Sequence, residues 1–191
     1  MSFRFFRTLS ITLGLGLSAF GFAQDVYAVD AVHSQVGFRI RHLVAKTSGR
    51  FTKYTGTIKV DTKDITKSSV EITIDASSIN TDSEGRDKHL RGADFFDTEK
   101  FPTITFKSSE VKEPEKGKLQ ITGVLTMHGV SKSITFPITN AGTRPGMKPG
   151  SVVAGFIDGT LKLNRNDFGI KTYPGVLGDD VEITLDIEAG K

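Results

Sequence analysis

The sequence predicts an all-β protein: an antiparallel barrel of eight strands with one short helical insert between the third and fourth strands. Eight runs of alternating apolar and polar residues indicate strands with one buried face each. Most of the runs are separated by short turns, as is typical of antiparallel neighbours. Several runs are long and contain glycines, which is typical of strongly curved sheets. Together these features favour a barrel over the two-sheet sandwich that the same pattern also allows.

The strands are expected to follow one another along the chain, each with a single apolar face. In the first, Phe38, Ile40 and His42 share that face, and in the second Phe51 is out of phase with Ile58, which indicates a bulge or a strand end. The fourth begins after Phe101 and Pro102. The eight expected strands are residues 28–43, 49–61, 69–76, 103–111, 118–127, 131–139, 150–164 and 179–189.

We expect the apolar faces to enclose one shared interior. An eight-stranded barrel is just wide enough to be filled by side chains or to hold one small ligand. In residues 150–164 the alternation places Ile157 in phase with Leu161, and so inside. The expected cavity-lining residues are Phe38, Ile40, His42, Ile58, Ile72, Phe106, Ile121, Leu125, Phe136, Ile157, Leu161, Ile183 and Leu185.

Alternation alone does not say whether the apolar face points inward or outward, because an outer-membrane barrel alternates too. Such barrels carry girdles of aromatic residues, whereas this chain has no Trp and three Tyr. The sequence therefore favours a barrel with an apolar interior and without stable membrane insertion.

Residues 81–106 interrupt the alternation. Thr81 and Glu84 have the spacing of a capping box, and Gly92 stands where a helix would end in a left-handed residue. This predicts a short helix over residues 82–91. The insert reads as a cover over one end of the barrel, held down by apolar side chains.

The cover and the end of residues 150–164 supply the expected rim of the cavity. A surface helix with salt bridges and a polar rim that holds a ligand headgroup explain the charges of the cover equally well. Arg165 continues the phase of Leu161, so we expect it to point inward, towards a ligand phosphate or carbonyl or towards Asp87. The expected rim and cover residues are Asp87, His89, Leu90, Phe95, Phe96, Arg165 and Phe168.

Residues 1–23 have the features of a secretory signal peptide. Arg4 and Arg7 precede an uncharged apolar segment that is too short to span a membrane, and small residues precede the expected cleavage after Ala23. Cleavage would leave residues 24–191 as one barrel domain in the periplasm. The chain has no cysteine, and a core of this size does not require disulfides.

Composition and motifs exclude several functions. The formal charge of +3 includes Arg4 and Arg7, so residues 24–191 carry only +1, which gives no electrostatic case for nucleic-acid binding. No histidines have metal-site spacing, and no motif for a nucleophile or a phosphate-binding loop is present. We therefore expect no metal, no cofactor and no catalytic residue. A homodimer is left open. The chain has four histidines: His33, His42, His89 and His128.

Six short motifs resemble the YceI family of secreted lipid-binding proteins, and in order and spacing they cover nearly all of residues 24–191. The resemblance implies a lipocalin-like barrel whose apolar cavity holds a polyisoprenoid or similar chain, such as a quinone tail, a polyprenyl phosphate or a fatty amide. It implies binding, storage or transport without catalysis. The alternative is a hydrolase or isomerase that acts on such a lipid through His and Asp residues at the cavity mouth. The motifs are HSQVGF at 33–38, HL at 42–43, DKHLR at 87–91 with DFF at 94–96, FPTITF at 101–106, GVLTMHGV at 123–130 and RNDFG at 165–169.

Overall fold

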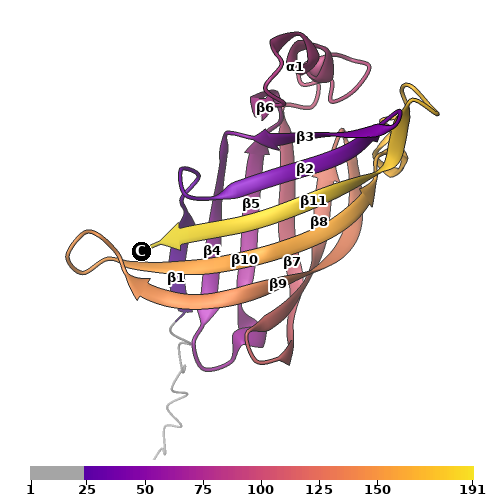
Figure 1. The fold of residues 1–191 in the computed structure, drawn as a ribbon. Coiled ribbons are helices and arrows are strands. Elements are labelled where there is room, and N and C mark those ends of the chain that lie inside the picture. The colour runs from indigo at the N-terminus through magenta and orange to yellow at the C-terminus, as the bar shows by residue number, and fades with distance from the viewer. Residues whose placement is uncertain (1–23) are drawn as a thin grey trace, which may run out of the picture.

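The computed structural model describes residues 24–191, so the expected signal peptide lies outside the described residues. The described chain is an antiparallel β-structure with one α-helix at one end (Figure 1). The α-helix is α1, Glu84–Arg91, and short 3-10 helices are η1, Ile65–Lys67, η2, Ala76–Ser78, and η3, Arg165–Phe168. The strands are β1, Gln24–Val29, β2, Gln35–His42, β3, Ala45–Phe51, β4, Tyr54–Asp61, β5, Ser69–Asp75, β6, Ile79–Asn80, β7, Thr103–Glu115, β8, Lys118–Met127, β9, Val130–Pro145, β10, Val152–Asn164, and β11, Leu177–Gly190.

The strands close into a ring of eight, as predicted. The order around the ring is β1-β4-β5-β7-β8-β9-β10-β11, and β11 pairs back with β1 at Ala28↔Gly190 and Val29↔Ala189. The three remaining strands, β2, β3 and β6, continue the sheet at one end of the ring. β2 follows β1 along β11, β3 pairs with β2, and β6 pairs with the end of β3. The first two expected strands, 28–43 and 49–61, are therefore each interrupted by a short break, whereas the third, 69–76, corresponds to β5.

Side chains stabilise the breaks. Between β1 and β2, the carboxylate of Asp30 accepts the N–H groups of Val32 and His33. Between β3 and β4, the hydroxyl of Thr52 donates to the carbonyl of Ser78, and the hydroxyl of Ser78 accepts the N–H of Lys53. The break after β3 explains why Phe51 is out of phase with the residues of β4, as the sequence indicated.

Helix α1 differs in detail from the prediction. The helix begins after Ser83, which makes no side-chain capping bond, so the capping box at Thr81 was wrong. The Thr81 hydroxyl donates instead to the carboxylate of Asp87. Gly92 closes the helix with φ −73°, so its expected left-handed conformation was also wrong.

Strand β10 contains a bulge that reverses its alternation. The register with β11 shifts between Phe156 and Gly159, and Asp158 has φ +59° within the shift. Phe156 faces inward before the bulge and Leu161 after it, whereas Ile157 is 40% exposed. The expectation that Ile157 lines the interior was therefore wrong, because an extra residue changes which face the following side chains occupy.

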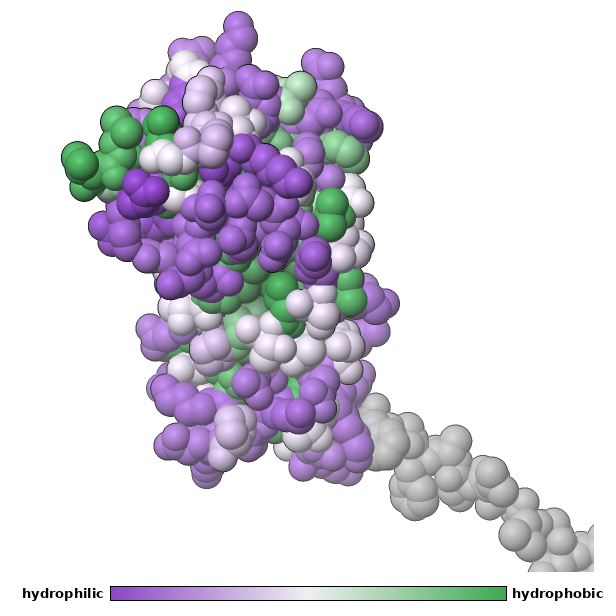
Figure 2. Space-filling model, turned by 90° about the vertical axis from the view of Figure 1, so that its right-hand side faces the viewer, coloured by the Kyte–Doolittle hydropathy of each residue, from purple (hydrophilic) through white to green (hydrophobic). Residues whose placement is uncertain are grey.

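The β9–β10 ladder covers only part of its two strands. It runs from Val152↔Pro145 to Ile157↔Thr139, although β9 begins at Val130 and β10 ends at Asn164. On one side of the molecule, hydrophobic residues are visible in a hollow between two hydrophilic surfaces (Figure 2). The apolar interior is therefore visible from outside the barrel.

Candidate functional site

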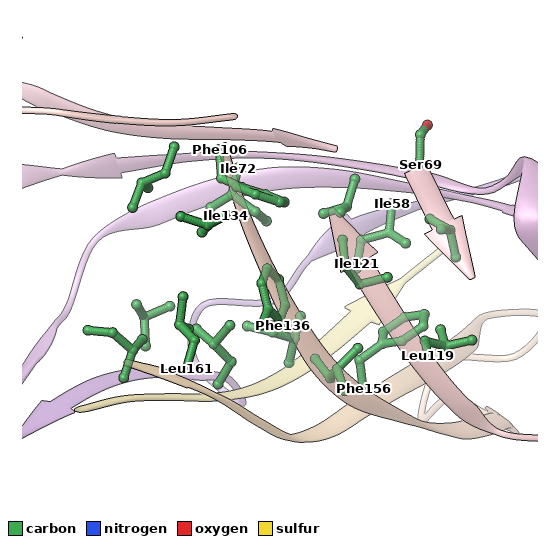
Figure 3. A pocket seen from close by; sticks show the side chains of 18 of the residues that line it. Ile58, Ser69, Ile72, Phe106, Leu119, Ile121, Ile134, Phe136, Phe156 and Leu161 are labelled. Carbon is green, nitrogen blue, oxygen red and sulfur yellow. The ribbon is translucent and has the colours of Figure 1, made fainter. Parts of the chain in front are cut away.

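The interior of the barrel contains an apolar cavity of about 180 Å³, here called the inner chamber. Its lining is hydrophobic except for Ser68 and Ser69, and Figure 3 shows side chains from several strands converging on it. A space with almost no hydrogen-bonding groups suits a hydrocarbon and penalises a polar ligand. Nine of the expected lining residues lie here: Ile58, Ile72, Phe106, Ile121, Leu125, Phe136, Leu161, Ile183 and Leu185.

A second cavity of about 440 Å³, here called the mouth chamber, lies beneath the cover. Its walls come from β2, β3, the helical insert and the segment 170–177. Three more expected lining residues, Phe38, Ile40 and His42, lie here rather than deep in the barrel. The expected rim residues that line the mouth chamber are His89, Leu90, Phe95, Phe96 and Arg165.

The two chambers share part of their lining. Phe51, Met127, Leu163 and Ile183 face both. The Phe51 ring also lies 6.0 Å from that of Phe38, centroid to centroid. These shared side chains form the boundary through which a long ligand would pass from one chamber to the other.

The cover and the segment 170–177 meet above the mouth chamber. The hydroxyl of Thr172 donates to the carbonyl of Asp94. The Tyr173 ring stacks on Phe95 at a centroid distance of 6.0 Å and meets the edge of His89 at 5.9 Å. His89 in turn lies 3.2 Å from a carboxylate oxygen of Asp94. Two segments far apart in sequence thus form one roof.

Arg165 points inward as predicted, but its partners differ from those expected. Its Nε donates to the carbonyl of Gly178 at 2.9 Å, and its Nη1 donates to the carbonyls of Ile170 and Thr172 at 2.9 and 2.7 Å. Its Nη2 lies 3.3 Å from a carboxylate oxygen of Asp179. Arg165 is 4% exposed and holds the segment 170–178 in place. The alternative that Asp87 pairs with Arg165 was wrong.

Asp87 and Phe168, both expected at the rim, line neither chamber. Asp87 is 5% exposed and accepts the N–H of Thr81 at 2.9 Å as well as its hydroxyl. This pairing satisfies a buried carboxylate and ties helix α1 to β6. The Phe168 ring is buried in the hydrophobic cluster around Ala76 and Ile104. Asp87 and Phe168 therefore stabilise the structure around the chambers without lining them.

Arg86 and Tyr173 are among the mouth-chamber residues that sequence reasoning missed. Arg86 lines it and donates from Nε to the hydroxyl and from Nη2 to the carbonyl of Thr81, both at 2.7 Å. The spacing could have found it, because Arg86, His89 and Leu90 are three and four residues apart on one helix face. Tyr173 gave no such signal, since it lies in a segment without periodicity.

The acid–base candidates do not converge. Asp87 is bonded to Thr81, His89 to Asp94, and His128 Nδ1 lies 3.0 Å from the carbonyl of Phe168. His128 lies in the turn between β8 and β9 and packs against the ring of Phe101. No two of the three candidates are hydrogen-bonded to each other within residues 24–191.

One group of side chains has donor atoms close enough to hold a cation: Asp30, His33 and Glu188, with ligand atoms within 4.8 Å of one another. His33 Nδ1 already lies 2.8 Å from Asp30 Oδ2, and Asp30 Oδ1 accepts two backbone N–H groups. The group lies outside both chambers, and its contacts are those of a structural turn.

Comparison with known proteins identifies relatives over nearly the whole chain. The model of the YceI-like domain matches residues 27–189. A UPF0312 protein of Vibrio parahaemolyticus is 36% identical over 181 residues, which are 93% of this chain and 93% of that protein. The described residues contain no helix with the length and apolar character needed to cross a membrane.

Two solved structures show the same architecture. Burkholderia cenocepacia BcnA superposes with a TM-score of 0.76 at 28% identity, over 84% of this chain and 99% of that one. A polyisoprenoid binding domain from Saccharophagus degradans, implicated in plant cell wall breakdown, superposes with a TM-score of 0.61. It is 16% identical, over 85% of this chain and 97% of that one, so this likeness concerns the fold.

Proposed function

This chain belongs to the YceI-like family, and we propose that it binds, stores or transports an isoprenoid-type lipid in the periplasm. The lipid is a polyprenyl phosphate, a quinone or a similar amphiphile. Its tail occupies the inner chamber and its headgroup lies in the mouth chamber. The observation that carries this proposal is the pair of adjoining chambers, one almost wholly apolar and the other with polar groups among its walls.

The energetics of tail burial support this arrangement. Removing a methylene group from water contributes about 0.8 kcal/mol, so each five-carbon isoprene unit contributes about 3–4 kcal/mol before ordering costs. Micromolar affinity requires about 8 kcal/mol, so a few units suffice even after several kcal/mol of lost freedom. In this proposal the residues that line the two chambers contact the lipid, whereas Ile157, Asp87 and Phe168 do not.

A carrier fits the geometry better than an enzyme does. A hydrolase or isomerase needs an acid and a base that reach the same substrate atom. Here Asp87 is buried against Thr81, and His128 is bonded to a backbone carbonyl at another turn. The polar groups of the mouth chamber are arranged as a rim around an apolar space.

The test is the lipid content of protein purified natively from the periplasm. Organic extracts are analysed by mass spectrometry for the wild type and for Leu161→Trp, in which the larger side chain fills the inner chamber. Val124→Trp is the matched control, because Val124 lies on the outer face of the barrel. Circular dichroism confirms that each variant is folded.

We expect an isoprenoid-type lipid in the wild type and in Val124→Trp, and much less in folded Leu161→Trp. Wild-type protein without any lipid, or equal lipid in all three proteins, contradicts binding in the inner chamber.

A further inference from the structure

The side chains that line the mouth chamber and can carry a charge near neutral pH are basic. Its lining includes two arginines and two histidines, and no carboxylate among the described residues lines it. The remaining walls are aromatic, aliphatic or hydroxyl-bearing side chains. Near-neutral protein surfaces mix both signs, so a concave site with only basic groups favours a ligand of negative charge. The four basic residues are His42, Arg86, His89 and Arg165.

Two of these residues have carboxylate partners of their own. Arg165 uses four donated hydrogen bonds on backbone carbonyls and on Asp179. His89 lies 3.2 Å from Asp94. The donors of Arg165 and the ring nitrogen of His89 are therefore largely directed to protein groups. Arg165 and His89 shape the chamber more than they offer groups to a ligand.

Arg86 is different because its partner is neutral. A guanidinium has five N–H donors, and only two of those of Arg86 are used, both on Thr81. Within residues 24–191, Nη1 of Arg86 has no hydrogen-bond partner, and the side chain is in no ion pair. Arg86 therefore retains donors for another group at the chamber.

The orientation of Arg86 is nevertheless defined. The hydroxyl of Thr81 gives its hydrogen to Asp87, and its oxygen then accepts from Nε of Arg86. Thr81 and Asp87 are both buried, so this chain of bonds is anchored in the protein. A guanidinium that is fixed along one edge and free along the other loses little conformational freedom when it binds a second group.

We propose that the mouth chamber takes an anionic headgroup, a phosphate or a carboxylate, and that Arg86 is the residue that binds it. This inference rests on the proposed lipid-binding function and narrows its ligand to an anionic amphiphile. The tail enters beside the aromatic residues of the cover and passes Phe51 into the inner chamber, while the headgroup stays at the free edge of Arg86.

The experiment compares ligands that share a tail and differ in charge. Farnesyl phosphate, farnesol and inorganic phosphate are titrated into delipidated protein by calorimetry below the aggregation threshold of the lipids. The variants are Arg86→Gln, Arg86→Lys and, as matched control, Lys88→Gln. Lys88 is an exposed cation on the same helix that lines neither chamber.

We expect the wild type and Lys88→Gln to bind farnesyl phosphate about 10- to 100-fold more tightly than farnesol, the size of one charge-assisted hydrogen bond. In Arg86→Gln this preference should fall to within about threefold, because the affinity for farnesyl phosphate falls more than the affinity for farnesol. Arg86→Lys should keep an intermediate preference, because it retains the charge without the forked geometry. Thermal denaturation shows whether each variant is folded.

The failures are distinguishable. If neither lipid binds, the proposed function fails. If both bind the wild type equally, the function stands and the anionic headgroup is wrong. A preference that survives in both folded Arg86 variants overturns the assignment of Arg86. Inorganic phosphate that binds as tightly as farnesyl phosphate identifies a free-anion site and overturns the lipid headgroup.

Discussion

The ring of Phe51 meets the ring of Phe96 edge to face, with centroids 5.8 Å apart and planes at 89°. Phe51 comes from the end of β3 and Phe96 from the cover, and Phe51 lines both chambers. The contact therefore joins the roof of the mouth chamber to the boundary of the inner chamber. It links the position of the cover to the width of the passage between them.

Replacing Phe51 should open this passage. Phe51→Ala removes the ring that faces both chambers, so a bound C20 isoprenoid alcohol should leave faster for acceptor vesicles than from the wild type. The variant should also lose roughly 2–4 kcal/mol of stability, because the partly buried ring leaves a cavity. Phe101→Ala is the control, since Phe101 packs on His128 and lines neither chamber. Equal release rates for the wild type and Phe51→Ala contradict the boundary role.

Neighbouring residues of β8 should respond oppositely to a charge. Leu125 is 8% exposed and lines the inner chamber, whereas Val124 is 44% exposed on the outside. Leu125→Asp buries an unpaired carboxylate and should lower the free energy of unfolding by at least about 3 kcal/mol. Val124→Asp should change it by less than about 0.5 kcal/mol. Urea denaturation of both variants measures the contrast, and equal losses would mean that the strand faces are wrongly assigned.

Arg165→Met should destabilise the protein locally. The change removes the hydrogen bonds to Gly178, Ile170 and Thr172 and leaves these carbonyls to find other partners. We expect a loss of about 2–4 kcal/mol and faster hydrogen exchange across residues 170–178. Asp179→Asn removes only the exposed partner and should cost less than about 1 kcal/mol. Unchanged exchange in folded Arg165→Met would refute the clamping role.

The turn between β1 and β2 should make the free energy of unfolding depend on pH. The hydrogen bond between Asp30 and His33 raises the pKa of His33 above its ordinary value of 6.5 and lowers the pKa of Asp30 below its ordinary 3.8. The His33 contribution is complete below its unfolded pKa and disappears as pH rises through the raised folded value. The Asp30 contribution is present above its unfolded pKa and disappears as pH falls through the lowered folded value.

Between these limits the pair is fully charged. His33→Gln should therefore reduce stability at a pH of about 5.5 and match the wild type near pH 9, well above the titration of a histidine. Urea denaturation at the two pH values measures this difference, and Asp30→Asn should remove the same pH dependence. A difference that does not shrink with rising pH would mean that His33 acts only through packing.

Export remains a prediction from residues 1–23. Cleavage after Ala23 should give a periplasmic product that begins at Gln24, and intact-mass spectrometry of that fraction checks this boundary. A full-length protein confined to the cytoplasm would contradict it.

Local alternation was sufficient to predict the eight strands of the ring, because each strand buries one face and therefore repeats every second residue. However, it did not reveal the break that follows β1, and it indicated the break that follows β3 only through the phase of Phe51. It failed at Ile157, where the bulge at Asp158 shifts the repeat in a way that a regular period does not reveal. Helix spacing placed Asp87 at the rim, because it does not reveal that the neighbouring Thr81 covers this carboxylate.

By itself the sequence determined eight strands, one short helix over a barrel end and an apolar interior. Only the tertiary structure decided that β11 closes on β1, that Arg165 holds residues 170–178, and that Arg86 faces the mouth chamber with donors unused. The physical reason is the range of the interactions. Alternation and helix spacing reflect interactions between residues a few positions apart. Ring closure and the roof of the mouth chamber depend instead on contacts between distant segments, such as that of Thr172 with Asp94. The path of the whole chain decides which distant segments meet.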